Sequence, residues 1–151
     1  MKDLETFCGV IRDYISLFDH LIEIEEKKID AVTKEQITFV ENCMNQEQAA
    51  ILKLRGLEMQ REETMKDLGC EGLSFREMTE KNPDFSASLL PLFQTLSARV
   101  QTFRTLSDSA KDLIETNLHI VNSILAESSA PAYGQNGSEQ DSPKHFTSRS
   151  V

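Results

Sequence analysis

Apolar residues recur at helical spacing along most of this 151-residue chain. In the first segment, three rows of apolar side chains lie beside one another on one helical face. The rows are Leu4, Phe7, Ile11, Tyr14, Phe18 and Leu21; Cys8, Ile15, Ile22 and Ile29; and Val10, Leu17 and Ile24. This face is wider than the seam of a two-stranded coiled coil, so we expect the first helix to contact more than one partner helix.

A polar pattern predicts where the second helix begins. Thr33 and Gln36 have the spacing of a capping box, in which each side chain binds a backbone amide of the other residue. Val32 and Ile37 hold the two positions of a hydrophobic staple. Helical periodicity then continues until Gly69, which is placed to take the left-handed conformation after the last turn. We therefore expect a long second helix between these signals.

The same capping pattern recurs before a much shorter segment. Ser74 and Glu77 form the second box, with Leu73 and Met78 as its staple. The sequence "KNPDF" ends this helix near Asn82, because the residue before a proline is disfavoured in the helical region. Only a short helix fits between these points.

The last helix is predicted to start between Pro83 and Ser88, since Pro91 is tolerated in a first turn but kinks a helix interior. It then runs to about Ser128, and its apolar residues become denser after Lys111. Half of "DLIETNLHIVNSIL" is apolar, namely Leu113, Ile114, Leu118, Ile120, Val121, Ile124 and Leu125. One neighbouring helix cannot cover a face this wide, so either another helix of this chain or a partner covers the rest.

Together these elements predict an all-α fold. We expect an elongated, coiled-coil-like antiparallel bundle of three long helices plus one short helix over residues 1–128, followed by a flexible tail over residues 129–151. Gly56 lies inside the second helix. It should weaken that helix by about 1 kcal/mol relative to alanine unless a neighbouring helix approaches closely there.

Composition excludes several classes of function. The formal net charge is −9, and the tail contributes none of it, so the folded body would repel nucleic acid phosphates and anionic lipid. The chain has no apolar run of the roughly 20 residues that a membrane span needs. Cys8, Cys43 and Cys70 form no CxxC pair, which favours small buried residues in a reducing compartment. We expect a cytoplasmic protein with no nucleic-acid function and no membrane insertion.

The sequence also contains no constellation typical of an enzyme. Di-iron bundles repeat a Glu-x-x-His pair, yet the residues three positions before His20, His119 and His145 are Leu17, Thr116 and Ser142. No Gly-rich phosphate-binding loop and no GxSxG motif occurs. The acidic clusters alternate with basic residues, as solvated helix faces do. We therefore predict no catalytic residue, no metal and no cofactor, which leaves a binding function.

The order of segments resembles a known family. The segment "ILKLRGLEMQREETMKDLG" resembles the Leu-x-x-Leu-Glu-x-x-Arg…Leu-Gly pattern of FlgN-type flagellar export chaperones. "LSFREM" occupies the place of that family's short middle helix, and "LIETNLHIVNSIL…AYGQNG" is similar to its apolar C-terminal helix and Tyr-Gly-x-x-Gly ending. The resemblance covers about Leu4 to Gly137. It departs from the family at "SDSAKD", where members often carry asparagines. The matching residues are Leu54, Leu57, Glu58, Arg61, Met65, Leu68 and Gly69.

The resemblance implies a chaperone of the hook-filament junction proteins, also called hook-associated proteins. Such a chaperone holds the C-terminal segments of its clients, prevents premature assembly and helps deliver them to the flagellar type III export apparatus. An amphipathic client helix fits an apolar groove with anchors at i, i+3/i+4 and i+7. The candidate partner-binding residues are Leu113, Ile114, Leu118, Val121, Ile124, Leu125 and Tyr133.

Alternatives stay open beside this hypothesis. Each apolar anchor also fits burial within its own bundle, and Asn117 fits either a buried register-fixing residue or simple exposure. Four methionines fit a core better than an adaptable client surface, namely Met44, Met59, Met65 and Met78. A self-associating structural or regulatory coiled coil is the competing function, and the oligomeric state is open. Tyr133 is a candidate latch that orders against a client or against the protein's own bundle.

Overall fold

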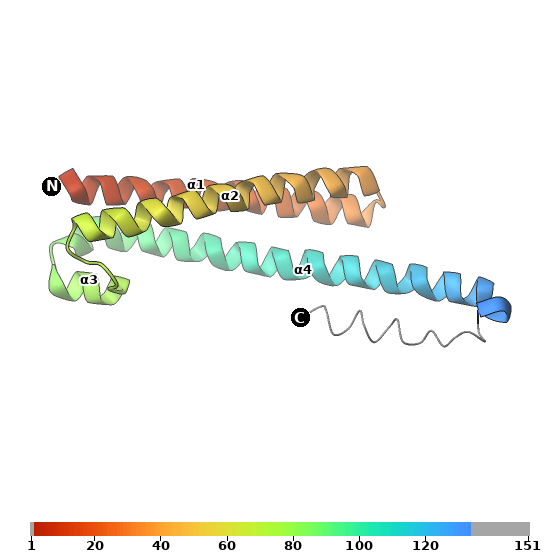
Figure 1. Cartoon of the computed structure of the whole chain (residues 1–151). Helices are drawn as coiled ribbons and strands as arrows, with labels where there is room; N and C mark the ends of the chain where they lie inside the picture. Colours follow the sequence, from red (N-terminus) through yellow and green to blue (C-terminus); the bar gives the residue numbers. More distant parts are fainter. Residues whose placement is uncertain (1, 134–151) are drawn as a thin grey trace. The chain divides into compact units, whose positions relative to one another are not determined.

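The computed structural model describes residues 2–133, with side chains over residues 3–127, and every element in this range is a helix. The helices are α1 (Lys2–Thr33), α2 (Ile37–Asp67), α3 (Phe75–Lys81) and α4 (Phe85–Tyr133), as Figure 1 shows. The predicted all-α fold with three long helices and one short helix is confirmed. The chain divides into two compact units, Met1–Lys111 and Asp112–Val151, so the division falls inside α4.

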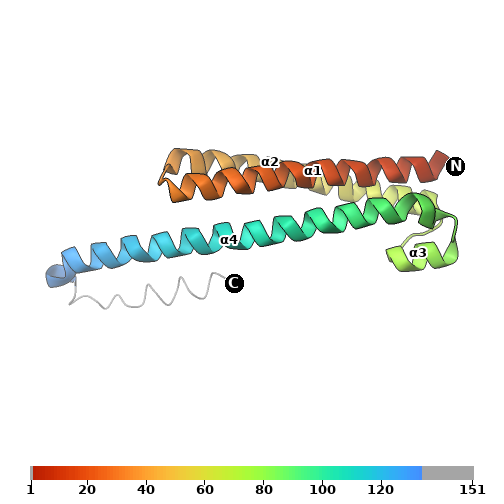
Figure 2. The same ribbon diagram turned by 180° about the vertical axis from the view of Figure 1, so that it is seen from behind.

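In the first unit, α1 packs against two other helices. α1 and α2 form an antiparallel hairpin. The first part of α4 also packs against α1, since Phe7 faces Phe93 with ring centroids 6.3 Å apart and Phe18 faces Phe103 at 5.7 Å. Residue numbers rise together in these two pairs, so α1 and this part of α4 run in the same direction, as Figure 2 also shows. The expectation that the wide apolar face of α1 contacts more than one helix is confirmed.

The main hydrophobic core lies at the end of the first unit that carries α3. Phe75 of α3 packs against Phe93 in a tilted arrangement with ring centroids 4.1 Å apart, which holds the short helix against α4. All three cysteines of the chain are buried and free, as predicted. The buried members of this core cluster are Phe7, Cys8, Val10, Ile11, Tyr14, Met65, Cys70, Met78, Phe85 and Leu89.

The predicted capping box before α2 is wrong. The hydroxyl of Thr33 donates to the Ile29 carbonyl at 2.8 Å inside the last turn of α1, and Gln36 makes no side-chain cap. Glu35 takes the left-handed conformation at φ 58°, which lets the Gln36 amide reach the Ala31 carbonyl at 2.8 Å. This is a Schellman ending of α1. It uses the residues that were expected to start α2, and Ile37 is left 73% exposed instead of forming a staple.

The predicted signals at the end of α2 and at the start of α3 are confirmed. Gly69 has φ 73° and ends α2 in a second Schellman motif, with the Cys70 amide on the Met65 carbonyl at 2.8 Å. Ser74 and Glu77 form the complete capping box of α3. The Ser74 amide donates to Glu77 at 2.8 Å, and this hydrogen bond lowers the pKa of the Glu77 carboxyl group.

The prolines of α4 do not limit it as predicted. The helix starts at Phe85, within the expected range, but Pro91 then lies inside it, beyond the first turn. At the other end the backbone stays helical through Pro131 to Tyr133, past the predicted end near Ser128. A proline removes one i→i−4 hydrogen bond, and the neighbouring turns keep theirs. The predicted split into a bundle over residues 1–128 and a tail over 129–151 stays a prediction, and residues 134–151 lie outside the described part.

Candidate functional site

The apolar side chains in the second unit's part of α4 are exposed. From Asp112 to Glu127, no described side chain is buried. Leu113 and Ile114 are half-buried. The remaining apolar side chains are exposed, with Leu118 at 57%, Ile120 at 49%, Val121 at 50%, Ile124 at 61% and Leu125 at 57%. The segment therefore presents large apolar surface, which a soluble chain rarely leaves open without a binding role.

Helical spacing places these side chains on one face of α4. Residues three and four positions apart are neighbours on a helix surface. One row follows the spacing i, i+4, i+7, i+11, and a second row lies beside it. The rows are Ile114, Leu118, Val121 and Leu125, and Leu113, Ile120 and Ile124. This two-row apolar face, which we call the α4 face, has the anchor spacing that binds an amphipathic partner helix.

Two further candidates belong to the same segment. Asn117 is half-buried, and it lies on the α4 face between the turns of Leu113 and Ile120. Tyr133 is the last residue of α4, and its side chain lies outside the described part of the chain. The Tyr-Gly ending at Gly134 and Gly137 lies outside it as well. The proposed latch role of Tyr133 therefore stays a prediction.

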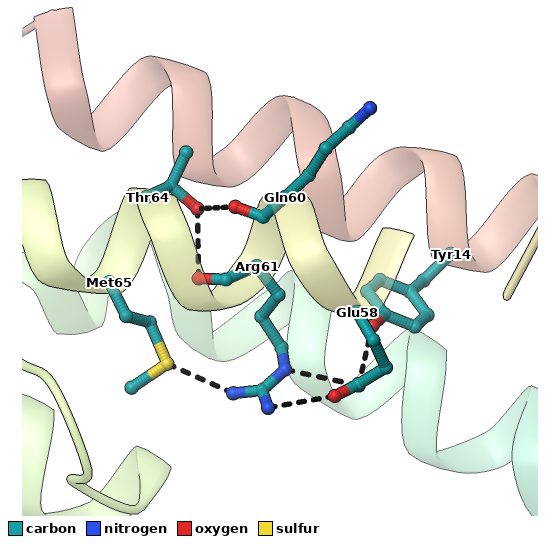
Figure 3. A network of polar contacts seen from close by, with 6 residues as sticks. All are labelled: Tyr14, Glu58, Gln60, Arg61, Thr64 and Met65. Carbon is teal, nitrogen blue, oxygen red and sulfur yellow. Dashed lines mark hydrogen bonds and ion pairs between the residues drawn. The ribbon is translucent and has the colours of Figure 1, made fainter. Parts of the chain in front are cut away.

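A polar network joins α1 to α2 in the first unit (Figure 3). The Tyr14 hydroxyl donates to Oε1 of Glu58 at 2.6 Å. Arg61 donates to the same carboxylate from Nε at 3.1 Å and from Nη2 at 2.9 Å, and its Nη1 lies 3.0 Å from Sδ of Met65. One carboxylate on α2 thus holds a tyrosine of α1 and an arginine one turn further along α2.

The electrostatics of this network favour a charged Glu58 and a neutral Tyr14. Hydrogen bonds from Arg61 and then from Tyr14 lower the pKa of Glu58. Burial, together with the neighbouring carboxylate, raises the pKa of Tyr14. A neutral phenol donating to an ionised, arginine-paired carboxylate is a stable arrangement at neutral pH. It ties helices together and offers no reactive group.

A second polar cluster lies deeper between α1 and α2. Glu25 has no exposed surface, and Nζ of Lys28 donates to its Oε1 at 3.1 Å and to Glu47 at 3.2 Å. Among the described residues, Oε2 of Glu25 has no hydrogen-bond partner. Burial, reinforced by Glu47, raises the pKa of Glu25 to about 7. Burial also acts to raise the pKa of Glu47, but Glu25 and Lys28 outweigh it and hold that pKa below its ordinary value.

Comparison with protein families decides what kind of protein carries these features. The model of the FlgN protein family matches residues 1–140. This chain belongs to the FlgN family. Neither a curated protein nor a solved structure matches the chain significantly. Membership assigns the chain a general role as a flagellar export chaperone, of the kind that binds flagellar hook-associated proteins.

The structure gives physical roles to the residues that resemble the FlgN pattern. Leu54 and Leu57 pack against both core clusters, and Glu58 and Arg61 form the network with Tyr14. Gly69 supplies the left-handed residue that ends α2. These residues build the helix hairpin, and the matched pattern therefore reports the fold of the FlgN chain more directly than its binding face.

One further surface of this FlgN chain was missed in the sequence. Six large apolar side chains of α2 are exposed. Phe39, at 60%, stands apart from the others. The remaining five lie on one outer face, namely Ile37 at 73%, Met44 at 46%, Ile51 at 41%, Leu52 at 65% and Met59 at 72% exposed. The prediction that the methionines fill the core holds for Met65 and Met78, which are buried, and is wrong for Met44 and Met59. The small residues Cys43 and Ala50, seven apart, mark the true core row of α2 and were the available signal.

The described part of the FlgN chain shows no group of residues suited to hold a metal ion. Within residues 2–133, no helix is long and apolar enough to cross a membrane. The candidate site consists of the exposed apolar side chains of the α4 face, and the polar clusters of the first unit join α1 to α2.

Proposed function

We propose that this FlgN family member is a cytoplasmic export chaperone that binds the C-terminal helical segments of flagellar hook-filament junction proteins. It prevents their premature assembly and assists their delivery to the flagellar type III export apparatus. The observation that carries the proposal is the α4 face, on which Leu118, Ile120 and Val121 are each about half exposed or more.

The physical basis is the burial of apolar surface. A large aliphatic side chain gains about 1.5–3 kcal/mol when it moves from water into a fully apolar contact. A client helix that lies along the α4 face can cover Ile114, Leu118, Val121 and Leu125 with one amphipathic stripe of its own. The net acidity of the chain adds a preference for clients with a basic flank.

The first unit supports the separation of scaffold and binding face. Both hydrophobic core clusters, the capping box of α3 and both polar clusters lie within Met1–Lys111. Removal of residues 112–151 therefore leaves all of these contacts in place. We expect such a truncated chain to stay soluble and helical.

Co-purification tests this proposal directly. The full chain and the chain lacking residues 112–151 are each mixed with an extract of a flagellated host, and captured proteins are identified by mass spectrometry. The full chain should retain hook-filament junction proteins, and the truncated chain should retain none while keeping its circular dichroism spectrum. Equal capture by both chains, or a captured set without junction proteins, contradicts the proposal.

We also propose that Tyr133 acts as a latch on the bound client. It follows the α4 face at the end of the helix, and tyrosine offers a large apolar ring with a polar tip. Tyr133→Ala should weaken client binding and leave the melting temperature unchanged. Unchanged affinity removes Tyr133 from the site.

The same face fits a second function, in which α4 pairs with its own copy as a structural or regulatory coiled coil. The exposure of Leu118 and Val121 is the observation that favours it. Sedimentation of the full and truncated chains distinguishes the two functions. A full chain that associates through residues 112–151 and retains no client would support the coiled coil against the chaperone.

A further inference from the structure

The outer face of α2 consists of two apolar rows on either side of a polar row. One apolar row is Ile37, Met44 and Ile51, each seven residues apart, and the other is Leu52 and Met59. Between them runs the exposed row Glu41, Gln48 and Arg55, again seven apart. The whole surface, which we call the α2 face, belongs to the first unit, whereas the α4 face belongs to the second unit.

We infer that the α2 face is a homodimer interface on which two copies of α2 pair in antiparallel orientation about a two-fold axis at Gln48. In an antiparallel helix pair, residues lie at the same level when their numbers add to a constant. An axis at Gln48 sets this constant at 96, and 41 + 55 = 96, so Glu41 of one copy lies level with Arg55 of the second copy. By symmetry the opposite pair forms as well, which is the signature of an isologous contact.

The same axis joins the apolar rows. Ile51 of the second copy comes to level 45, since 96 − 51 = 45, directly beside Met44 of the first copy in the same row. On the other side of the seam, Leu52 and Met59 of the second copy come to levels 44 and 37, so each copy contributes its own half of the apolar surface. Rows at a seven-residue spacing stay in register along paired helices. Met44 and Ile51 therefore pair directly on one side of the central charge pairs, and Leu52 and Met59 add apolar surface on the other side.

The charge pattern selects both the partner and the orientation. Glu41 and Arg55 are exposed, carry opposite charge and lie at equal distance from Gln48, seven residues to either side. A parallel pair would place Glu41 against Glu41 and Arg55 against Arg55, which is repulsive. In the antiparallel orientation, Glu41 and Arg55 of each copy lie level with Arg55 and Glu41 of the other copy, so both charges are paired.

Charge-reversed variants of the full chain test the interface by sedimentation equilibrium. Glu41→Arg alone and Arg55→Glu alone each create two like-charge pairs, so each should raise the dimer dissociation constant at least about tenfold. An equimolar mixture of the two variants restores opposite charges across the seam and should associate as heterodimers. Glu63→Arg, an exposed change of the same charge off the face, is the matched control and should dimerise as the wild type does.

Three outcomes overturn the inference. The first is a wild-type chain that stays monomeric up to about 1 mM, where association becomes too weak to be specific. The second is a mixture of the two variants that remains as monomeric as each variant alone. The third is loss of client binding in these variants without any change in association, because the α2 face would then serve another protein.

The inference fails or holds independently of the chaperone function. Dissociated Glu41→Arg should still bind client through the α4 face, and Val121→Asp should still dimerise. Association in the mixture would exclude misfolding as the reason that each variant alone dissociates, because two misfolded variants would not associate with each other. That association is the result we expect.

Discussion

Two apolar helical stretches of the chain have similar sequence patterns and opposite environments. In α1, Phe7 and Ile11 are each 1% exposed, in a core cluster that includes residues of α2 and of the first part of α4. In α4 beyond Lys111, Leu118 is 57% and Val121 is 50% exposed. Helical periodicity predicts that an apolar face exists, and only neighbouring elements decide whether the chain itself covers it. The covered face builds the scaffold, and the exposed face is the one that we propose binds a client.

The largest expected effect is the difference in folding stability lost when a side chain is truncated on the covered face and on the exposed face. Phe7→Ala should destabilise the protein by about 3–5 kcal/mol, because it removes a fully buried aromatic ring and leaves a cavity. Leu118→Ala, a comparable truncation at an exposed site, should change stability by no more than about 0.5 kcal/mol. Urea denaturation measures both. Similar losses for the two variants would mean that the α4 face is part of the folded core.

A smaller effect on stability tests whether Glu25, between α1 and α2, is shielded from water in solution. The pKa of buried Glu25 is raised to about 7 from an ordinary value of 4.5, so the folded state binds a proton more tightly than the unfolded chain. This contribution to stability is fully present below about pH 4.5 and is lost as the pH rises through about 7. Glu25→Gln should reduce the loss of stability between about pH 5.5 and 8 by roughly 2 kcal/mol.

The control for that titration is Glu26→Gln, an exposed change on the same helix. Its stability should follow the wild-type pH profile. If Glu25→Gln also follows that profile, the carboxyl group is hydrated in solution and the pair with Lys28 is a surface contact.

The smallest expected effect is a gain in stability at Gly56, which tests whether this side of α2 is exposed as well. A Cβ at Gly56 meets nothing within 4 Å, so the close helix approach that would explain a glycine there is absent in the described part of the chain. Gly56→Ala should therefore stabilise the protein by about 1 kcal/mol, because alanine has the higher helix propensity. A destabilised variant in urea denaturation would show that another element covers this side of α2.

Sequence patterns predicted the helices well and their ends unevenly. Ser74 and Glu77 form the predicted capping box, whereas Thr33 and Gln36 share its spacing and do not. The difference is that Glu35 adopts the left-handed conformation and closes α1 with a Schellman motif, which removes Thr33 and Gln36 from capping. A pattern of four residues cannot reveal which of two adjacent helices will use them.

The sequence predicted which segment forms the candidate site, but it did not predict whether the side chains of that segment are buried or exposed. The density of apolar residues after Lys111 correctly marked a segment with more apolar surface than the chain buries. The α2 face was missed because Ile37, Met44 and Ile51 share the helical period of the core residues. Cys43 and Ala50 occupy the core row instead, since small side chains allow close packing against α1.

The most direct test of the central claim is a titration of the full chain with a peptide from the C-terminal helical segment of a junction protein. Val121→Asp, which places a charge in the middle of the α4 face, should weaken binding at least about tenfold and leave the melting temperature unchanged. Phe39→Asp, at a 60% exposed site outside both the α4 face and the α2 face, should bind as the wild type does. Equal affinity of Val121→Asp and the wild type would contradict the assignment of the α4 face as the client-binding site.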